Sequence, residues 1–224
     1  MTLRLFAATV FLASMSACLA HASPVTVEGG VGSVSDYRFR GVSLSDRKPA
    51  LQADFTASHT SGAHAAVFVS TIDEYGQDSG GKGATVELDY TIGWEFTGAG
   101  LDFDVAASAY TYPGAVGVNY VELPVQAAKT IGPWTGSIGF AYAPEQRALE
   151  RDNRYLWIGI DYDGPALPVV LSAQAGREDG AYADRKTDWS LSASRTLGHL
   201  QGSASYVDSN RGGGRLVLTL AARF

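Results

Sequence analysis

The last stretch of the chain, residues 214–224, reads G-R-L-V-L-T-L-A-A-R-F. Counting back in twos from Phe224, every second residue is apolar, and the positions between them include two arginines and a threonine. This period is typical of a β-strand with one apolar face. A final strand that ends on an aromatic residue is typical of bacterial outer-membrane barrels. The segment therefore predicts a membrane barrel with Phe224 as its C-terminal signal for the barrel assembly machinery, and a strand of a soluble sandwich is the alternative.

The amino-terminal residues have the pattern of a secretory signal peptide. A single basic residue, Arg4, precedes an apolar run over residues 5–20, and residues 20–22, Ala-His-Ala, supply a small-x-small cleavage site. We expect cleavage at this site, so that residues 1–22 are a signal peptide. Residues 23–224 would then form one domain, the barrel itself.

Cysteine usage and net charge narrow the class of protein further. The one cysteine, Cys18, lies in the leader, so the mature chain has no disulfide, which is unusual for a small exported soluble domain but not for a closed barrel. A lipoprotein site at Cys18 is a competing interpretation, disfavoured because Met15 stands where leucine is expected. Without Arg4, 16 of the 17 Lys and Arg remain against 23 Asp and Glu, a net charge of −7. This acidic balance argues against a nucleic-acid partner.

The middle of the chain consists of short alternating runs. In residues 84–96 the apolar positions alternate without an error with Thr, Glu, Asp and Gly. There are about twelve such runs. The length of most runs is close to the ~9 to 11 residues that a tilted membrane strand needs. Breaks after odd-numbered runs are long and polar, including the last at residues 208–213, whereas breaks after even-numbered runs are short. The rhythm predicts an all-β fold, a transmembrane antiparallel up-and-down barrel with its long loops outside the cell.

Aromatic residues are expected to gather in two belts on the lipid face of this barrel. The first run is read as one strand over residues 26–40, which places Tyr37 and Phe39 in the outer belt. Pro124 interrupts a predicted strand and removes a ladder hydrogen bond, so it marks a bulge or a shifted register. The remaining belt residues are Tyr142, Trp189 and Tyr206 at outer ends and Trp94, Phe96, Trp134 and Phe224 at periplasmic ends.

Charged residues with inward parity suggest how the lumen selects solutes. Because the first and last strands pair to close a barrel, we expect Arg38, Arg40 and Arg215 to lie close together toward the outer half. Acidic residues would face them across the lumen and create a transverse field at a constriction. Mutually paired charges that only satisfy the interior are the alternative. The predicted acidic pore-lining residues are Glu87, Asp89, Asp104 and Glu122.

Several large aromatic residues also have inward parity. They are Tyr110, Tyr112, Tyr120, Tyr155 and Trp157. Such side chains either fill the lumen of a narrow barrel or form a stacking path for sugars and other ring-bearing solutes.

Catalytic and metal-binding patterns are weak in this chain. His59 and Ser61 form a His-x-Ser pair, but the topology places it in a periplasmic turn, away from the outer leaflet. His64 and His199 also fall near the periplasmic rim, and no metal cluster can be drawn from them. We therefore expect no enzyme and no cofactor. A structural or adhesive barrel and, less favoured, an outer-membrane lipid hydrolase remain as alternatives.

Residues 35–41, S-D-Y-R-F-R-G, begin a pattern that resembles the TorF family of proteobacterial porins. Further points of similarity are P-A-L-Q at residues 49–52, Y-T-Y-P-G at 110–114 and N-Y-V-E at 119–122. The resemblance runs over essentially the whole mature chain and implies a porin. Together with the strand pattern, it predicts a channel in the lipid bilayer of the bacterial outer membrane. We expect passive diffusion of small hydrophilic solutes with a weak preference for cations.

Overall fold

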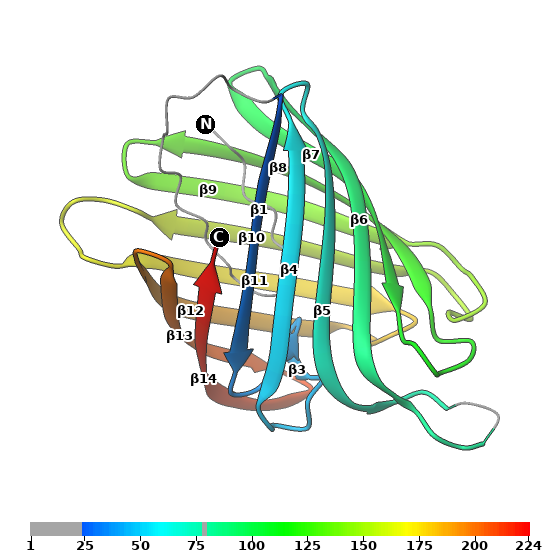
Figure 1. Cartoon of the computed structure of the whole chain (residues 1–224). Helices are drawn as coiled ribbons and strands as arrows, with labels where there is room; N and C mark the ends of the chain where they lie inside the picture. Colours follow the sequence, from blue (N-terminus) through cyan, green and yellow to red (C-terminus); the bar gives the residue numbers. More distant parts are fainter. Residues whose placement is uncertain (1–23, 78–79) are drawn as a thin grey trace.

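The computed structural model describes residues 24–77 and 80–224, in which twelve strands form a closed antiparallel barrel (Figure 1). Each barrel strand pairs with its neighbour in sequence order, and β1 pairs with both β4 and β14 to close the ring. The predicted fold class and strand number are thus confirmed, whereas the predicted signal peptide, residues 1–22, lies outside the described residues. The barrel strands are β1 (Val25–Val34), β4 (Ala50–His59), β5 (Ala63–Tyr75), β6 (Ala84–Gly98), β7 (Leu101–Thr111), β8 (Tyr120–Ile131), β9 (Trp134–Ala143), β10 (Asn153–Tyr162), β11 (Val170–Gly180), β12 (Lys186–Leu197), β13 (Leu200–Ser209) and β14 (Gly212–Arg223).

The two ends of the barrel carry different connections (Figure 1). At one end, here named the turn end, β1 begins, β14 ends, and tight turns such as residues 99–100 and 198–199 join the strands. At the other end, the loop end, the connections are longer, but the predicted long break at residues 208–213 is wrong. Strands β13 and β14 continue through it and leave only a turn at residues 210–211, because the backbone hydrogen bonds of a ladder do not require an apolar outer face.

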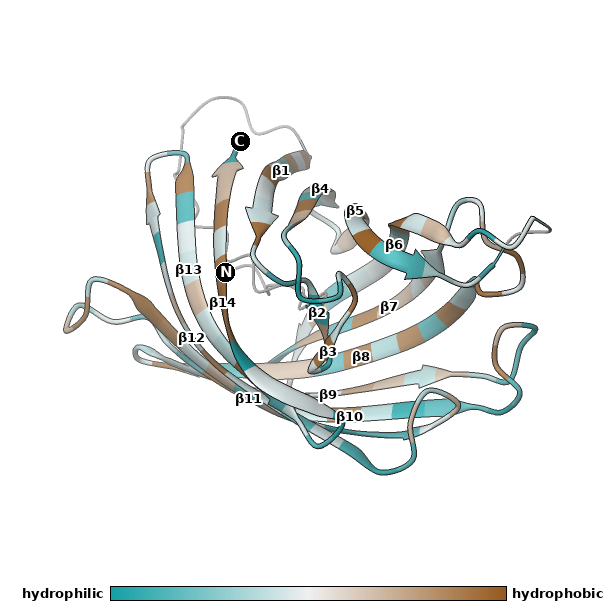
Figure 2. Ribbon diagram, turned by 90° about the horizontal axis from the view of Figure 1, so that it is seen from below, coloured by the Kyte–Doolittle hydropathy of each residue, from teal (hydrophilic) through white to brown (hydrophobic). Residues whose placement is uncertain are grey.

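The outer surface of the barrel is apolar. Leu216, Leu218 and Leu220 of β14 are 58%, 54% and 63% exposed, while the alternate positions point inward. Figure 2 shows the same alternation of hydrophobic and hydrophilic residues along the ribbon of several strands. No helix in the described ranges is long and apolar enough to cross a membrane.

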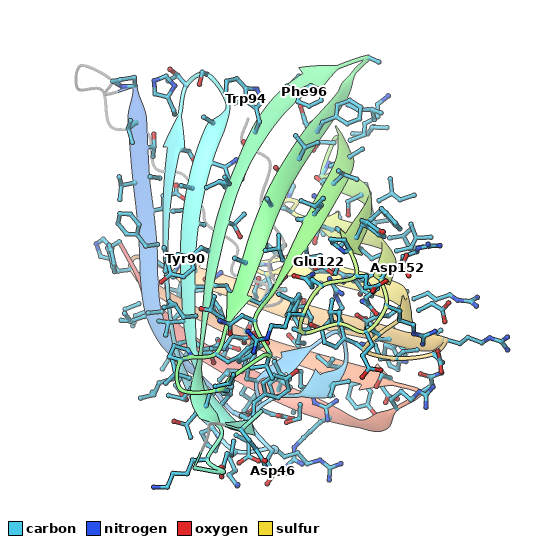
Figure 3. The ribbon with its side chains drawn as sticks, turned by 90° about the vertical axis from the view of Figure 1, so that its right-hand side faces the viewer. Asp46, Tyr90, Trp94, Phe96, Glu122 and Asp152 are labelled. Atoms are coloured by element: carbon cyan, nitrogen blue, oxygen red, sulfur yellow. The ribbon has the colours of Figure 1, made fainter. Side chains whose placement is uncertain are left out.

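Exposed aromatic residues mark both ends of this outer surface. Figure 3 shows Trp94 and Phe96 of β6 near the turn end, with Tyr90 further along the strand. Near the loop end the rings of Trp189 and Tyr206 lie 5.4 Å apart on neighbouring strands. Such positions suit side chains that have one apolar and one hydrated end, at the borders of an apolar band.

The first predicted strand is too long. Strand β1 ends at Val34, and the chain then turns inward through a small hairpin of β2 (Arg38–Phe39) and β3 (Val42–Ser43). Tyr37 and Phe39 therefore do not belong to the outer belt: the Tyr37 side chain is only 2% exposed, and the Phe39 ring lies 5.8 Å from the inward-facing Tyr110.

Pro124 interrupts pairing without changing the register of the sheet. On the β7 side, Val105 pairs with Val125 and Ser108 with Glu122, so the same register holds on both sides of the proline, which lacks a pair there. On the β9 side Pro124 pairs with Ala141 in an unbroken ladder. The missing N–H thus locally opens one ladder, and the predicted bulge or register shift at this position is wrong.

Candidate functional site: a loop folded into the barrel

The connection between β1 and β4, residues 35–49, folds into the lumen; we call it loop 1. Figure 2 shows its strands β2 and β3 inside the ring of barrel strands at the loop end. Tyr37 packs against Phe68 of β5, with 5.8 Å between ring centroids. Leu44 packs against the same apolar cluster, which also contains Ile72 of β5 and Val217 of β14. Loop 1 thus has a packed core of its own with the inner wall and narrows the lumen.

A buried aspartate organises the turn of loop 1. The Asp36 carboxylate accepts hydrogen bonds from Arg38 Nε at 2.8 Å and Ser43 Oγ at 2.5 Å. The Ser45 hydroxyl accepts a hydrogen bond from the Tyr37 backbone N–H at 2.9 Å. An isolated buried carboxylate would cost several kcal/mol, so these partners are what allow Asp36 to lie inside the barrel. The residues 35–41 that carry the family resemblance are therefore the residues that build the inward turn.

Arg38 connects loop 1 to β13 and β14. These strands lie next to the barrel seam, the pairing of β1 with β14 that closes the ring. Its guanidinium donates to the carbonyl oxygens of Gly41 at 3.0 Å and Gly213 at 3.0 Å, and at 3.4 Å to that of Val207. Gly41 has a φ of +82°, and a Cβ at this position would lie 2.6 Å from the Ser209 Cβ. Only glycine combines this backbone conformation with so close an approach to the wall.

Arg40 reaches the opposite side of the lumen. Its guanidinium forms ion pairs with Glu122 of β8 at 2.6 Å and with Glu178 of β11 at 2.8 Å. Lys186 of β12 forms an ion pair with Glu178 at 2.5 Å and donates to the Arg40 carbonyl oxygen at 2.8 Å. We call these four residues the Arg40 clamp. The two cations and two carboxylates balance, so the buried group carries no net charge.

The Arg40 clamp is shielded from solvent and held from several directions. The exposed fractions of its side chains are 8% for Arg40, 1% for Glu122, 3% for Glu178 and 4% for Lys186. The Arg40 guanidinium also lies over the Tyr155 ring, 4.1 Å from the centroid, a favourable cation–π position. Burial acts to lower the pKa of Arg40, but the charges of Glu122 and Glu178 outweigh it and raise the pKa, so Arg40 stays charged.

The predicted arginine wall does not form as expected. Arg38 and Arg40 belong to loop 1 instead of a barrel strand, and Arg215 of β14 is exposed. The interpretation failed because alternate charged residues inside a loop have the same period as a strand. The sequence pattern does not reveal Glu178, because residues 177–186 are mostly polar and match a long break between strands, although Gly176 and Glu178 continue the inward positions of β11.

The predicted acidic residues separate into three groups. Glu122 belongs to the Arg40 clamp. Glu87 and Asp89 lie together on β6, where the Tyr112 hydroxyl donates to Glu87 at 2.8 Å. The ion pairs of the described residues include no basic partner for either of them. Asp104 lies elsewhere, 3.8 Å from Nε2 of His64.

Four of the predicted lumen aromatics form two ring pairs. Tyr110 and Tyr120 stack with centroids 4.5 Å apart, and Tyr155 stacks with Trp157 at 5.5 Å. Tyr120, Tyr155 and Trp157 are buried and belong to two separate clusters. These four rings therefore pack the inner wall around loop 1 in two separate groups.

The His-x-Ser pair noted in the sequence does not belong to loop 1. His59 Nδ1 lies 2.8 Å from Ser61 Oγ in the exposed turn between β4 and β5, at the turn end. Residues 24–77 and 80–224 contain no group of three or more His, Cys, Asp or Glu side chains that could hold a metal ion.

Comparisons with solved structures reveal a shared barrel fold. An outer-membrane channel from Pseudomonas putida F1 matches with a TM-score of 0.56 and 13% identity, over 94% of this chain and 100% of that chain. Salmonella typhi OmpF, in complex with daunomycin, matches with a TM-score of 0.47 and 9% identity, over 89% and 97% of the two chains. At such low identity the first likeness supports the fold alone.

Comparisons of sequence identify the family. A search of curated proteins found no match. The resemblance to TorF porins stays a prediction, because the family model that matches carries another description. That model spans residues 19–217, most of the chain, which therefore belongs to the family described as bacterial protein of unknown function (Gcw_chp).

Proposed function

We propose that this protein is a porin-like channel of the bacterial outer membrane, through which small hydrophilic solutes diffuse passively. The observation that carries the proposal is a closed barrel with an apolar exterior and a polar interior. A water-soluble barrel would place its apolar face inward, and so large an apolar exterior needs a lipid or protein partner. The exposed aromatic residues at both ends support the membrane placement, with the turn end toward the periplasm and the loop end outside.

Loop 1 sets the narrow part of this channel in the proposal. It crosses the lumen from the β1 side to Glu122 and Glu178, and it is held at the seam by Arg38. Because the Arg40 clamp balances its own charges, the other acidic residues of the lumen wall, among them Glu87, Asp89 and Asp104, would leave a negative excess in the local field. A weak preference for cations follows from this balance. The proposal includes no catalytic step.

A barrel with a structural or adhesive role is the second candidate. It is favoured by one observation, the packing of loop 1 side chains against β5 and β14 inside the lumen. If this packing closes the lumen permanently, the protein conducts nothing and acts through its surface.

Planar-bilayer recording distinguishes the two functions. The folded protein is reconstituted and its single-channel conductance and reversal potential are measured across a KCl gradient. We expect measurable conductance and a reversal potential that favours cations. The double variant Glu87→Gln, Asp89→Asn should move the reversal potential toward zero, and Glu150→Gln in an exposed loop serves as the matched control. The effect should weaken at 1 M salt, where the screening length is ~3 Å.

A variant that lacks most of loop 1 separates a closed channel from a structural barrel. If the parent is silent but this variant conducts, loop 1 is a gate in a channel. If both proteins are folded and neither conducts, the channel proposal is wrong and the structural role stands.

A further inference from the structure

The loop end of the barrel contains a cavity that loop 1 leaves open. Its volume is about 670 Å³, within the ~300–1,000 Å³ of typical small-molecule sites. Phe39 and Leu44 of loop 1 line one part of it, and the connection between β11 and β12 lines another. We call this cavity the vestibule. A solute that enters the barrel from the loop end meets the vestibule before the Arg40 clamp, whose Glu178 and Lys186 also line it.

Four tyrosines form an aromatic band in the vestibule. The rings of Tyr75 and Tyr112 lie 4.6 Å apart, and those of Tyr120 and Tyr182 lie 5.0 Å apart. All four line the cavity. Within the band Tyr112 and Tyr120 are buried, whereas Tyr75 and Tyr182 are each 37% exposed. The band thus presents two accessible aromatic rings that are backed by two fixed ones, so little side-chain entropy remains to be lost on binding.

Half of the charged side chains of the vestibule are paired with one another. Five acidic and three basic residues line it. Arg151 pairs with Asp184, and Lys186 pairs with Glu178. An anion would meet an acidic excess, and two of the three cations are already paired with carboxylates, while Arg211 donates to the Asp184 carbonyl oxygen. The recognition elements that remain are aromatic faces, phenol hydroxyls and carboxylate oxygens that accept hydrogen bonds.

We propose that the vestibule binds neutral sugars, which the channel then admits; the inference rests on the proposed channel function and names its solute class. A pyranose ring has an apolar C–H face that can lie on the exposed faces of Tyr75 and Tyr182. Its hydroxyl groups at the ring edge can donate to carboxylates and exchange hydrogen bonds with phenols. The mixture of aromatic faces and a few polar groups is what small-molecule sites commonly use for orientation.

The geometry disfavours the main rival ligand, a quaternary ammonium ion. Such ions are bound in cages where several aromatic faces surround the charge. In the vestibule the rings contact each other in tilted pairs, with interplanar angles of 47° for Tyr75 and Tyr112 and 59° for Tyr120 and Tyr182, so part of each ring is covered by its neighbour. This arrangement gives a band and not a cage.

Binding is measured on the folded full-length protein in detergent by isothermal titration calorimetry, with maltose and sucrose as neutral probes and choline and citrate as charged probes. We expect a sugar to bind more tightly than either charged probe. Tyr75→Ala and Tyr182→Ala should each raise the Kd for that sugar about tenfold. Tyr75→Phe and Tyr182→Phe should retain most of the affinity, because they keep the stacking face.

The matched control is Tyr162→Ala, which removes an equivalent ring at the turn end, where Tyr162 lies 4.8 Å from Trp134. It should leave sugar binding unchanged. Folding of each variant is verified by heat-modifiable gel mobility. The proposal is overturned if no neutral sugar binds, if choline or citrate binds more tightly, or if the tyrosine variants bind the sugar as the parent does.

Conductance is recorded separately, so that the two proposals fail in different ways. Sugar binding without conductance would refute the channel and leave the vestibule site intact. Conductance that no sugar reduces, together with absent binding, would refute the vestibule site and leave the channel intact.

Discussion

Arg40 and Glu122 lie 2.6 Å apart although 82 positions separate them in the chain. The contact joins loop 1 to β8, a strand that does not neighbour either of the strands that loop 1 connects. A second ion pair, from Arg40 to Glu178 on β11, extends the span further around the ring. The position of loop 1 across the lumen therefore depends on a small number of charge-assisted contacts, which can be tested one at a time.

Arg40→Met should release loop 1 from the far wall. The change leaves Glu122 and Glu178 with Lys186 as their one remaining cation in the Arg40 clamp, and breaking one side of a buried ion pair costs up to about 3–5 kcal/mol. We expect a lower free energy of unfolding in urea, faster proteolysis of loop 1 and a larger conductance. The lumen also becomes more negative, so the reversal potential should shift toward stronger cation preference.

Arg154→Met is the matched control for the Arg40 variant. Arg154 pairs with Asp152 at 2.6 Å, but its side chain is 62% exposed on the outside of the barrel. Exposed pairs contribute little to stability. Equal effects of the two substitutions on unfolding and proteolysis would contradict a special role for the Arg40 clamp.

Gly41→Ala should displace the tip of loop 1 from the wall. The added Cβ meets both a left-handed φ of +82° and the Ser209 side chain at 2.6 Å. Gly114→Ala separates these two costs, because Gly114 has a φ of +98° and no atom within 4 Å of an added Cβ. Each change carries a backbone cost of about 1–2 kcal/mol. We expect only Gly41→Ala to increase proteolysis of loop 1, and the same increase with Gly114→Ala would show that backbone strain alone acts.

Ile138→Arg and Ser137→Arg test which face of β9 contacts lipid. Ile138 is 51% exposed and lies midway between Trp134 and Tyr142, whereas Ser137 has inward parity. An arginine near the membrane centre destabilises a barrel by ~2–4 kcal/mol, while lumen positions tolerate charge. We expect Ile138→Arg alone to lower the free energy of unfolding by this amount in lipid vesicles. Similar losses at both positions would refute the membrane placement of this face.

Phe224→Ser should lower the yield of folded barrel. The backbone of Phe224 exchanges two hydrogen bonds with Gly29, at 2.9 and 3.0 Å, and a Cβ on Gly29 would lie 2.8 Å from the Phe224 ring. The aromatic side chain thus covers the glycine at the turn end of the β1–β14 contact. Heat-modifiable gel mobility of membrane fractions measures the folded fraction, with Phe96→Ser as the control for loss of an exposed ring. Unchanged folding of Phe224→Ser would exclude a role in assembly.

The barrel could be predicted from the sequence because its rule is local. In β6, a two-residue period over residues 84–96 assigns lipid and lumen faces without knowledge of any other strand. The same rule misassigned Tyr37 and Phe39, since polar and aromatic residues also alternate in loop 1. Loop 1 is recognised only through Asp36, Gly41 and their partners, and these partners lie on strands that are distant in sequence.

The candidate site was predictable in kind but not in pairing. Arg40 and Glu122 were both expected in the lumen, yet their mutual contact depends on the path of loop 1 across the ring. Glu178 and Lys186 could not be recognised because their strands extend beyond the apolar band, where outward positions such as Arg177 and Thr187 are polar too. The apolar period that reveals a membrane strand ends at the edge of the bilayer.

The seam of the barrel has the weakest ladder, with five paired positions between β1 and β14 against ten between β1 and β4. Arg38 crosses this seam from inside, because its contacts with Val207 and Gly213 span 169 and 175 positions of the chain. Contacts of such high sequence separation form late in folding, after most of the loop-closure entropy has been lost. Closure of the barrel and packing of loop 1 in the lumen are therefore expected to occur in one kinetic step. We expect this step to follow the formation of the last hairpin, β13–β14.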